Sequence, residues 1–391
     1  DLKLRTSYGF TGNTEIGVYE SLATLGSNSW TIGNQLVSGF YPNRIPNPDL
    51  KWEKTGQFDI GFDLGLFNNR LRLTADYYYK KTTDLLYNVA IPSASGYDSM
   101  LKNIGSVQNK GYELSIEIDS LSGAFSWTTA FNISFNRNKV LELGGETYKD
   151  VGTYDDHLKT SDIRRLIVGQ PIGVFYGYRF DGIFQNEAEC AQQTSSPSPI
   201  GVGLRRYKDL NGDGKIDATN DREILGDANP KFFGGMTNTF AYKGFELNVF
   251  LQYSYGNKIF NYNAMELESP TGGQNVYQDL VNRWTPTNPS NEYQKATTNR
   301  NNIVSDRFIE DGSFLKLKTV SLSYSFPKLN WKHIGGLRLY VTGQNLLTWT
   351  KYRGYDPEVS YRGASTLEAG EDFGVYPQAR TFMFGIKLDI K

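Results

Sequence analysis

Long stretches in which apolar and polar residues strictly alternate set the strongest constraint on how this chain folds. In QFDIGFDLGL, residues 57–66, every second residue is apolar and the residues between are polar or glycine. Successive side chains of a β-strand point to opposite faces, so this pattern predicts a strand with one apolar and one polar face. The same alternation recurs at 70–80, 112–119, 125–135, 245–255 and 380–390. Asn68-Asn69 and Lys243-Gly244 separate neighbouring runs, as tight hairpin turns do. The chain is therefore predicted to be all-β and antiparallel.

The lengths of these runs, and of the segments between them, favour a transmembrane barrel over a soluble β-sandwich. Most of the strands expected around these runs extend over 10 to 14 residues. Strands of soluble sheets usually have about 5 to 6 residues, whereas a tilted strand needs about 9 to 11 to cross a bilayer. Short turns alternate with long connections, and aromatic residues gather toward strand ends, as in outer-membrane barrels; packing in a soluble core is the alternative for these aromatics. We expect ten strands, at 2–9, 53–66, 70–86, 105–119, 124–137, 230–242, 245–256, 313–326, 336–348 and 379–390.

The composition excludes several classes of function. The 391 residues carry a net charge of -1 and no basic run, which argues against a nucleic-acid partner. There are two histidines and one cysteine, Cys190, too few for most His- or Cys-based metal and catalytic centres and for intrachain disulfides. No apolar run reaches the length of about 18 residues that a transmembrane helix needs. Asp155 and Asp156 could suggest a glycosidase pair, but solvated loop acids are the simpler reading, and we expect no enzyme.

The segment KDLNGDGKID, residues 208–217, has the spacing of a calcium-binding loop. Such loops place oxygen ligands at positions 1, 3, 5, 7 and 9, with glycine at position 6. Position 12 is Asn220, and the nearest acid follows one residue later, so the closing ligand departs from the pattern. The alternative is a solvated turn rich in Asp and Asn. We predict a structural metal site, calcium rather than magnesium, at 209–221 in the long connection 138–229. Its ligands are Asp209, Asn211, Asp213, the carbonyl of Lys215, Asp217 and Asp221.

Several long segments of the chain resemble the SusC/RagA family of TonB-dependent outer-membrane transporters. The resemblance rests on LKLRTSYGFTGN (2–13), NPDLKWEKTGQFDIGFDLGLFNNRLRLTADYYYKKTTDLL (47–86), IGVFYGYRFDGIFQ (172–185), residues 207–261, FLKLKTVSLSYSFP (314–327) and RLYVTGQNLLTWTKYRGYDPEV (338–359). These segments occur in order over nearly the whole chain. In two respects the chain departs from the family: the metal loop closes one residue later, and the chain ends in DIK rather than on an aromatic residue.

The resemblance implies a whole protein larger than this chain. It implies a 22-stranded barrel, an N-terminal plug, a SusD-like surface lipoprotein and import driven by TonB in the outer membrane of a Gram-negative, Bacteroidetes-like bacterium. We expect residues 1–391 to be the C-terminal part of that barrel, with the plug and the first half of the barrel outside this chain. The connection 138–229 would then be an extracellular loop region. Pairing of two transporter–lipoprotein complexes stays open.

On this reading the chain imports an oligosaccharide or an oligopeptide rather than catalysing a reaction. Apolar rows would face lipid, and polar residues such as Asp59, Asp63, Glu113, Glu117 and Asn132 would face the lumen. Candidate substrate contacts in the loops are Trp284, Tyr293, Tyr361 and Arg362, for which ordinary loop packing is the alternative. The rival hypotheses are a soluble, secreted, calcium-clipped β-module that binds glycans, and an outer-membrane enzyme or adhesin.

Overall fold

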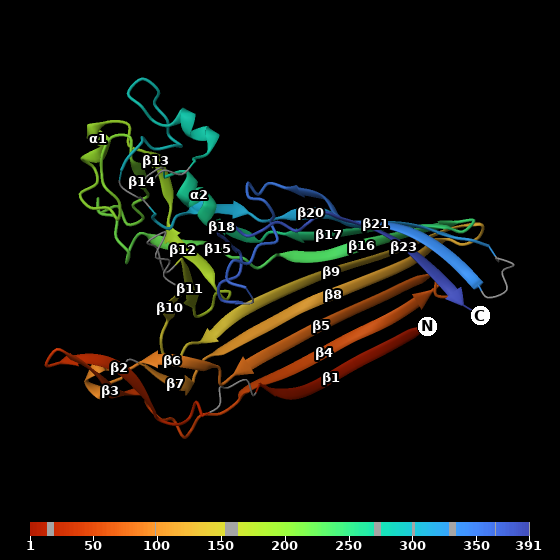
Figure 1. The fold of residues 1–391 in the computed structure, drawn as a ribbon, viewed down its shortest axis with the longest axis horizontal. Coiled ribbons are helices and arrows are strands. Elements are labelled where there is room, and N and C mark those ends of the chain that lie inside the picture. The colour runs from red at the N-terminus through yellow and green to blue at the C-terminus, as the bar shows by residue number, and fades with distance from the viewer. Residues whose placement is uncertain are drawn as a thin grey trace.

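A computed structural model describes residues 1–13, 19–97, 99–152, 163–269, 275–298, 302–327, 334–363 and 365–390. In these residues ten long strands form one antiparallel sheet in the order β1-β4-β5-β8-β9-β16-β17-β20-β21-β23 (Figure 1). The strands are β1 (Leu2–Asn13), β4 (Glu53–Leu66), β5 (Leu71–Thr83), β8 (Ser106–Leu121), β9 (Phe125–Glu142), β16 (Phe232–Tyr242), β17 (Phe245–Tyr255), β20 (Phe314–Ser325), β21 (Ile334–Thr350) and β23 (Thr381–Ile390). All ten predicted strands are confirmed, and β1, β8, β9 and β21 extend beyond their predicted ends.

The short turns lie at the end of the sheet where both chain termini lie (Figure 1). Between β4 and β5, Asn68 and Asn69 have φ angles of 57° and 63°, and between β16 and β17, Lys243 and Gly244 have 45° and 89°. Two consecutive residues with positive φ give a turn whose twist matches that of the flanking strands. The long connections all leave the opposite end of the sheet.

The apolar face of the sheet is uncovered. On the terminal strand β23, Phe382, Phe384 and Ile386 are 61%, 82% and 68% exposed, and Leu2 and Leu4 on β1 are 66% and 77% exposed. A soluble sheet would bury such rows against a second layer. Uncovered apolar rows over strands of 10 to 18 residues are expected where lipid takes the place of that layer.

The other face of the sheet carries charges that pair with one another across strands. Arg5 on β1 contacts Asp63 on β4 and Asp76 on β5, each at 3.0 Å, and Arg72 pairs with Glu117 on β8. The residues predicted to share this face do so, because the register aligns them across the strands. They are Asp59, Asp63, Glu113, Glu117 and Asn132.

The long connections contain short elements of their own. Two hairpins follow β1 and β5: β2 (Thr24–Ile32) with β3 (Gln35–Arg44), and β6 (Leu86–Ala90) with β7 (Ser99–Asn103). The later connections hold β10 (Tyr148–Val151), β11 (Arg164–Ile167), β12 (Val174–Tyr178), β13 (Phe180–Ile183), β14 (Arg205–Tyr207), β15 (Arg222–Gly226), β18 (Lys258–Asn261), β19 (Ile309–Asp311) and β22 (Glu371–Asp372). Short helices are α1 (Glu187–Cys190) and α2 (Tyr262–Leu267), and single 3-10 turns lie at Ser93–Ser95, Gln278–Asn282 and Asp306–Phe308. No helix in the described ranges is long and apolar enough to cross a membrane.

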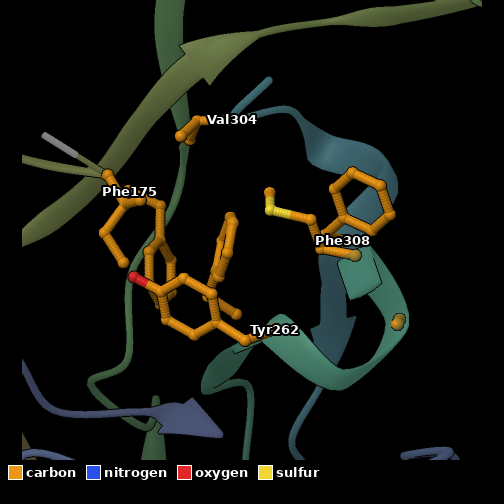
Figure 2. Packing of buried hydrophobic residues seen from close by; sticks show 8 residues of the cluster. Phe175, Tyr262, Val304 and Phe308 are labelled. Carbon is orange, nitrogen blue, oxygen red and sulfur yellow. The ribbon is translucent and has the colours of Figure 1, made fainter. Parts of the chain in front are cut away.

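The largest buried apolar cluster lies in these connections, off the end of the sheet. Figure 2 shows Phe175, Tyr262, Val304 and Phe308 gathered from β12, α2 and the segment before β19. Phe373, from the connection after β21, packs against the same cluster. The described parts of 143–231, 256–313 and 351–380 therefore form one packed unit, called here the loop body.

Candidate functional site

The connection after β21 is fastened to the polar face of the sheet by a buried lysine. Lys316 on β20 donates from Nζ to Asp356 Oδ1 at 2.6 Å and to Glu358 Oε2 at 2.5 Å. Gln252, which pairs with Lys316 in the register of β17 and β20, donates to Glu358 Oε1 at 3.2 Å. Lys318 reaches Glu358 at 3.0 Å. Because Lys316 and Gln252 belong to the polar face, the segment 356–358 lies against that face and not beside the apolar rows.

The charges of this anchor stabilise one another. Lys316 is 1% exposed and Asp356 7%. Burial is the largest single influence and acts to raise the pKa of the Asp356 and Glu358 carboxyls. The hydrogen bonds and positive charges around them together outweigh burial, so the pKa of each carboxyl lies below its ordinary value. Both carboxylates are therefore charged at neutral pH, and they balance the charges of Lys316 and Lys318.

A cavity of ≈ 450 Å³ lies between this segment and the ends of the strands. Phe233, Gln252 and Phe314 contribute to its wall from the polar face, and Glu358 and Ser360 contribute from the connection. Aromatic rings beside amide, hydroxyl and carboxylate groups can stack on and hydrogen-bond a sugar or a peptide. The cavity lies where the polar face meets the loop body, which makes it the best-placed ligand site in the described residues.

A buried ion pair joins the first and last connections of the loop body. Arg164 on β11 donates from Nε to Glu371 Oε1 on β22 at 3.0 Å, and both side chains are 1% exposed. Arg164 also donates to the carbonyl oxygens of Gly173 and Ala369, and its guanidinium lies 4.2 Å from the ring of Phe175. Burial lowers the pKa of Arg164 and raises that of Glu371, so each charge is maintained by the other.

Glu268, directly after α2, is the centre of a second buried group of charges. Its carboxylate lies 2.7 Å from Arg307, 3.3 Å from Arg353 and 3.7 Å from Arg205. Glu310 on β19 accepts from Arg353 at 2.9 Å. Three connections thus meet at one carboxylate, and the loop body is held by charge as well as by its apolar cluster.

The predicted substrate contacts fall into two separate pairs. Trp284 donates its backbone N–H to the carbonyl of Tyr293 at 2.9 Å and its Nε1–H to Gln185 at 3.1 Å. Tyr293 lies beneath the guanidinium of Arg307 at 4.9 Å. Both side chains are half-buried by partners within the loop body. Their contact with substrate stays a prediction.

The second pair, Tyr361 and Arg362, lies on the connection after β21. The Arg362 guanidinium lies 4.9 Å from the Tyr361 ring and within 3.5 Å of Glu371, and the Tyr361 ring meets Phe373 edge-on at 5.3 Å. Tyr361 is 38% exposed, so of these four residues it has a ring accessible to a ligand.

The anchor residues Lys316, Asp356 and Glu358 were not predicted. Two lysines at alternate positions inside the apolar run FLKLKTVSLSY are the signal that could have identified them. Asp155 and Asp156 lie outside the described residues.

The predicted metal loop is an ordered turn held by its own carboxylates. Asp209 accepts from the backbone N–H of Gly212 at 2.6 Å and of Gly214 at 2.7 Å. Asp221 is fully buried and accepts from the N–H of Leu210 and of Asp217, both at 2.8 Å. Asp221 thus closes the loop, although it stands one residue after the usual position.

The donor set of the loop fits a hard cation in kind, since it consists of oxygen atoms, and each carboxylate oxygen has a further lone pair. Asp217 also accepts from the backbone N–H of Asn220 and Thr219, which lowers its pKa and keeps it charged. In the described parts of the chain, no three acidic, His or Cys side chains are arranged around a common metal position. Calcium binding by this loop stays a prediction.

Comparison with known proteins identifies the family. A family model described as TonB dependent receptor-like, beta-barrel matches residues 1–184. TonB-dependent receptor P3 of Formosa agariphila is 41% identical over 395 residues, covering 99% of this chain and 39% of the relative. TonB-dependent receptor SusC of Bacteroides thetaiotaomicron is 29% identical over 99% of this chain and 37% of the relative. The solved RagAB peptide transporter is similar with a TM-score of 0.81 and 28% identity, over 99% of this chain and 41% of that chain. The chain belongs to the SusC/RagA family.

Membership of the SusC/RagA family accounts for the uncovered apolar face. Members of this family are β-barrels of the outer membrane, and the ten strands are part of such a wall. The chain spans between 37% and 41% of the length of the SusC/RagA-type relatives described above. The wall of an outer-membrane barrel is apolar toward lipid and polar toward the interior, so the polar face that carries the anchor at Lys316 is the interior side of the wall.

Proposed function

We propose that this chain supplies part of the wall and outer loops of an importer for oligomeric nutrients, either glycans or peptides, driven by TonB. The observation that carries the proposal is the connection after β21 fastened to the polar face at Lys316, with a ligand-sized cavity beside it. A transporter needs side chains that can bind its substrate where the loops meet the lumen, and the residues lining this cavity are of that kind. The similarity to a peptide transporter and to SusC supports the same role.

The proposed whole protein is larger than the described sheet. β1 and β23 are the outermost strands in the sheet order, so further strands can pair with both edges and close a barrel of 22 strands. In this proposal residues 1–391 are the C-terminal part, a plug and a TonB-contacting segment are contributed by the remainder, and a SusD-like lipoprotein covers the loop body. The soluble glycan-binding module is disfavoured, because it would need a second layer over the apolar rows.

Import would proceed by capture at the loops and passage along the polar face. Phe233, which is 43% exposed, offers a stacking surface to a repeating polar oligomer, and Gln252 and Glu358 offer hydrogen bonds. Both sugars and peptides carry such groups, so the choice between them needs direct measurement.

The experiment is recovery of the full-length protein from its native outer membrane in mild detergent. We expect a SusD-like lipoprotein and a bound oligomer to co-purify, and mass spectrometry of that oligomer decides between glycan and peptide. The mass of the complex, measured by light scattering, tells whether two transporter–lipoprotein pairs associate. Recovery of the protein alone in a soluble fraction would overturn the proposal.

Variants connect the import activity to the cavity. Phe233→Ala with Gln252→Ala should reduce uptake of the identified oligomer by about tenfold or more, because two ligand contacts are worth roughly 1 kcal/mol each. Leu247→Ala, on the apolar face of β17, is the control and should leave uptake unchanged. Equal uptake by the cavity variant and the native protein would show that the substrate passes elsewhere.

For the Asp-rich loop we propose a structural Ca²⁺ held by Asp209, Asn211, Asp213, the Lys215 carbonyl, Asp217 and Asp221. The cation would screen the repulsion among the four carboxylates and stiffen the connection. Titration of the purified full-length protein with Ca²⁺ and Mg²⁺, followed by calorimetry and by protease cleavage near residue 212, tests this. Asp213→Asn should weaken Ca²⁺ binding at least tenfold, whereas Asp49→Asn, an exposed acid outside the loop, should not. The absence of any Ca²⁺ heat in the native protein would leave the solvated turn as the correct reading.

A further inference from the structure

The apolar face of the sheet changes character near the end from which the long connections leave. There, two rows of residues run across five adjacent strands, β1, β4, β5, β8 and β9. The first row is Tyr8, Phe58, Tyr79, Lys110 and Arg137, and the second is Phe10, Gly56, Lys81, Gln108 and Lys139. Four of these ten positions are basic and none is acidic. Lys54 stands in the next row, beside Thr83. The basic rim is defined as Lys54, Lys81, Lys110, Arg137 and Lys139.

The cations of the basic rim are exposed and unneutralised by the fold. None of the five pairs with a carboxylate in the part of the chain that the structure describes. The ammonium of Lys54 lies 4.4 Å from the ring of Phe10, and Arg137 donates to the carbonyl oxygens of Asn136 and Lys231. These partners position the side chains but carry no full negative charge.

Two of these cations face each other directly. Lys110 on β8 is aligned with Arg137 on β9 in the sheet register, and Lys81 is a diagonal neighbour of Lys110. Like charges directly opposite on an antiparallel sheet repel each other and destabilise the pair. An anion bound between the strands would convert this repulsion into attraction. The one acid in the third row, Glu142, lies at the far side, on β9.

A groove of ≈ 280 Å³ lies beside the basic rim on the same face. Its floor is built from the rings of Tyr8, Phe10, Phe58 and Tyr79, and Lys54 and Lys81 stand at its edge. The next row toward the centre of the sheet contains Tyr77 and Tyr112, whose ring centroids are 5.0 Å apart. Aromatic rings at this depth are typical of the boundary between the acyl chains and the headgroups.

Among the residues that the structure describes, the other end of the same face has no such cations. The corresponding row there consists of Leu64, Leu73, Ile116 and Phe131. A second groove at that end, of ≈ 320 Å³, is lined by Phe245, Tyr324, Leu339 and other uncharged residues. The basic residues on this lipid-facing side are thus concentrated at the long-loop end, which is the outer surface in outer-membrane barrels. The outer leaflet there consists of phosphorylated glycolipid.

We propose that the basic rim and the aromatic groove bind one phosphorylated glycolipid of the outer leaflet. Lys81, Lys110 and Arg137 would hold its phosphate, and an acyl chain would lie against Tyr8, Phe10 and Phe58. The cations of the basic rim complement a phosphate, and an anion would relieve the repulsion between Lys110 and Arg137. The adjoining apolar groove favours a lipid over a soluble anion. The site is separate from the lumen and does not depend on which nutrient the protein imports.

The test compares two triple variants of the full-length protein, purified in mild detergent. The rim variant is Lys81→Gln, Lys110→Gln and Arg137→Gln, the three residues proposed to hold the phosphate. The control variant, Lys80→Gln, Lys243→Gln and Lys387→Gln, removes the same charge from the polar face and from the short-turn end. Native mass spectrometry measures co-purified glycolipid, and titration with diphosphorylated lipid A in nanodiscs measures affinity. Each cation near an anionic membrane surface contributes about 1 kcal/mol. We therefore expect affinity to fall roughly 100-fold in the rim variant and to stay unchanged in the control.

Two further probes identify the chemistry. Lipid A without phosphate groups should bind as weakly to the native protein as the phosphorylated form binds to the rim variant. Inorganic phosphate at millimolar concentration should not displace the lipid. Equal binding of the dephosphorylated lipid, full displacement by inorganic phosphate, or an equal loss in the control variant would each overturn the proposal. Retained nutrient uptake by the rim variant confirms that its fold is intact and separates this outcome from failure of the import proposal.

Discussion

Arg164 and Glu371 form a fully buried ion pair although 207 residues separate them, with Arg164 Nε 3.0 Å from Glu371 Oε1. The pair ties β11, in the connection after β9, to β22, in the connection after β21. Glu371→Gln would leave the Arg164 charge buried without its counter-charge, which typically costs about 3–5 kcal/mol. We expect the loss in the local stability of the loop body, measured as faster amide exchange in β12 and α2. Asp181→Asn, which breaks an exposed pair with Arg206, is the matched control and should cost less than about 1 kcal/mol. Equal exchange in both variants would show that the buried pair adds nothing.

Lys316→Gln should release the connection after β21 from the polar face. The substitution leaves Asp356 buried without its ammonium partner, with an expected cost of about 3–5 kcal/mol. Cleavage by an added protease between residues 351 and 363 is the measurement. Lys318→Gln removes one contact to Glu358 from a more exposed position and should leave the cleavage rate nearly unchanged. If the two variants are cleaved at the same rate, the anchor is not at Lys316.

Acid should release the same connection. The pKa values of Asp356 and Glu358 lie below their ordinary values of 3.8 and 4.5. A carboxyl with a lowered pKa contributes stability that is fully present above the unfolded pKa and is lost as the pH falls through the folded one. Protection of the segment 351–363 from amide exchange should therefore be constant from pH 7 to about 5. It should begin to fall near pH 4 and be lost as the pH drops further, through the lowered folded-state pKa values. The Lys316→Gln protein should lack this dependence, and an unchanged acid transition in it would contradict the assignment.

Gly244→Ala should destabilise the hairpin between β16 and β17. Gly244 has a φ of 89°, and an added Cβ would lie 2.6 Å from the carbonyl oxygen of Ser325. Strain of this kind costs about 1–3 kcal/mol. Urea unfolding of the barrel in lipid vesicles measures the effect. Gly123→Ala, in a neighbouring turn with open space around it and no positive φ, is the control and should unfold like the native protein.

The wall could be predicted from the sequence, whereas most of the site could not. Along β4, β5 and β9, apolar residues alternate with polar ones because one face of each strand meets lipid and the other meets water. A local sequence pattern is therefore sufficient to identify these strands. The short strands of the loop body, three to five residues in β11, β12 and β14, are too brief to show a period. Their positions are set by partners far along the chain, as β18 is by its parallel partner β22.

The candidate ligand residues show the same limit. Trp284 and Tyr361 were chosen because aromatic residues in loops often contact ligands, and the structure places each among partners inside the loop body. The anchor depends on Lys316 meeting Asp356 and Glu358 across 40 residues or more, a contact that no local pattern records. The turn of the Asp-rich loop is local, so its spacing within thirteen residues is itself a signal, and calcium binding there stays a prediction.

The long separation between Arg164 and Glu371 in the sequence also determines the order in which the two residues are synthesised. A chain is synthesised from its N-terminus, so Arg164 exists for the time needed to make two hundred further residues before its counter-charge is present. The same holds for the cluster around Phe175, which awaits Phe308 and then Phe373. The outer unit therefore cannot be completed segment by segment as the strands emerge. It is complete only after residues 371–373 have been made, because Glu371 and Phe373 supply the last contacts of the ion pair and of the cluster.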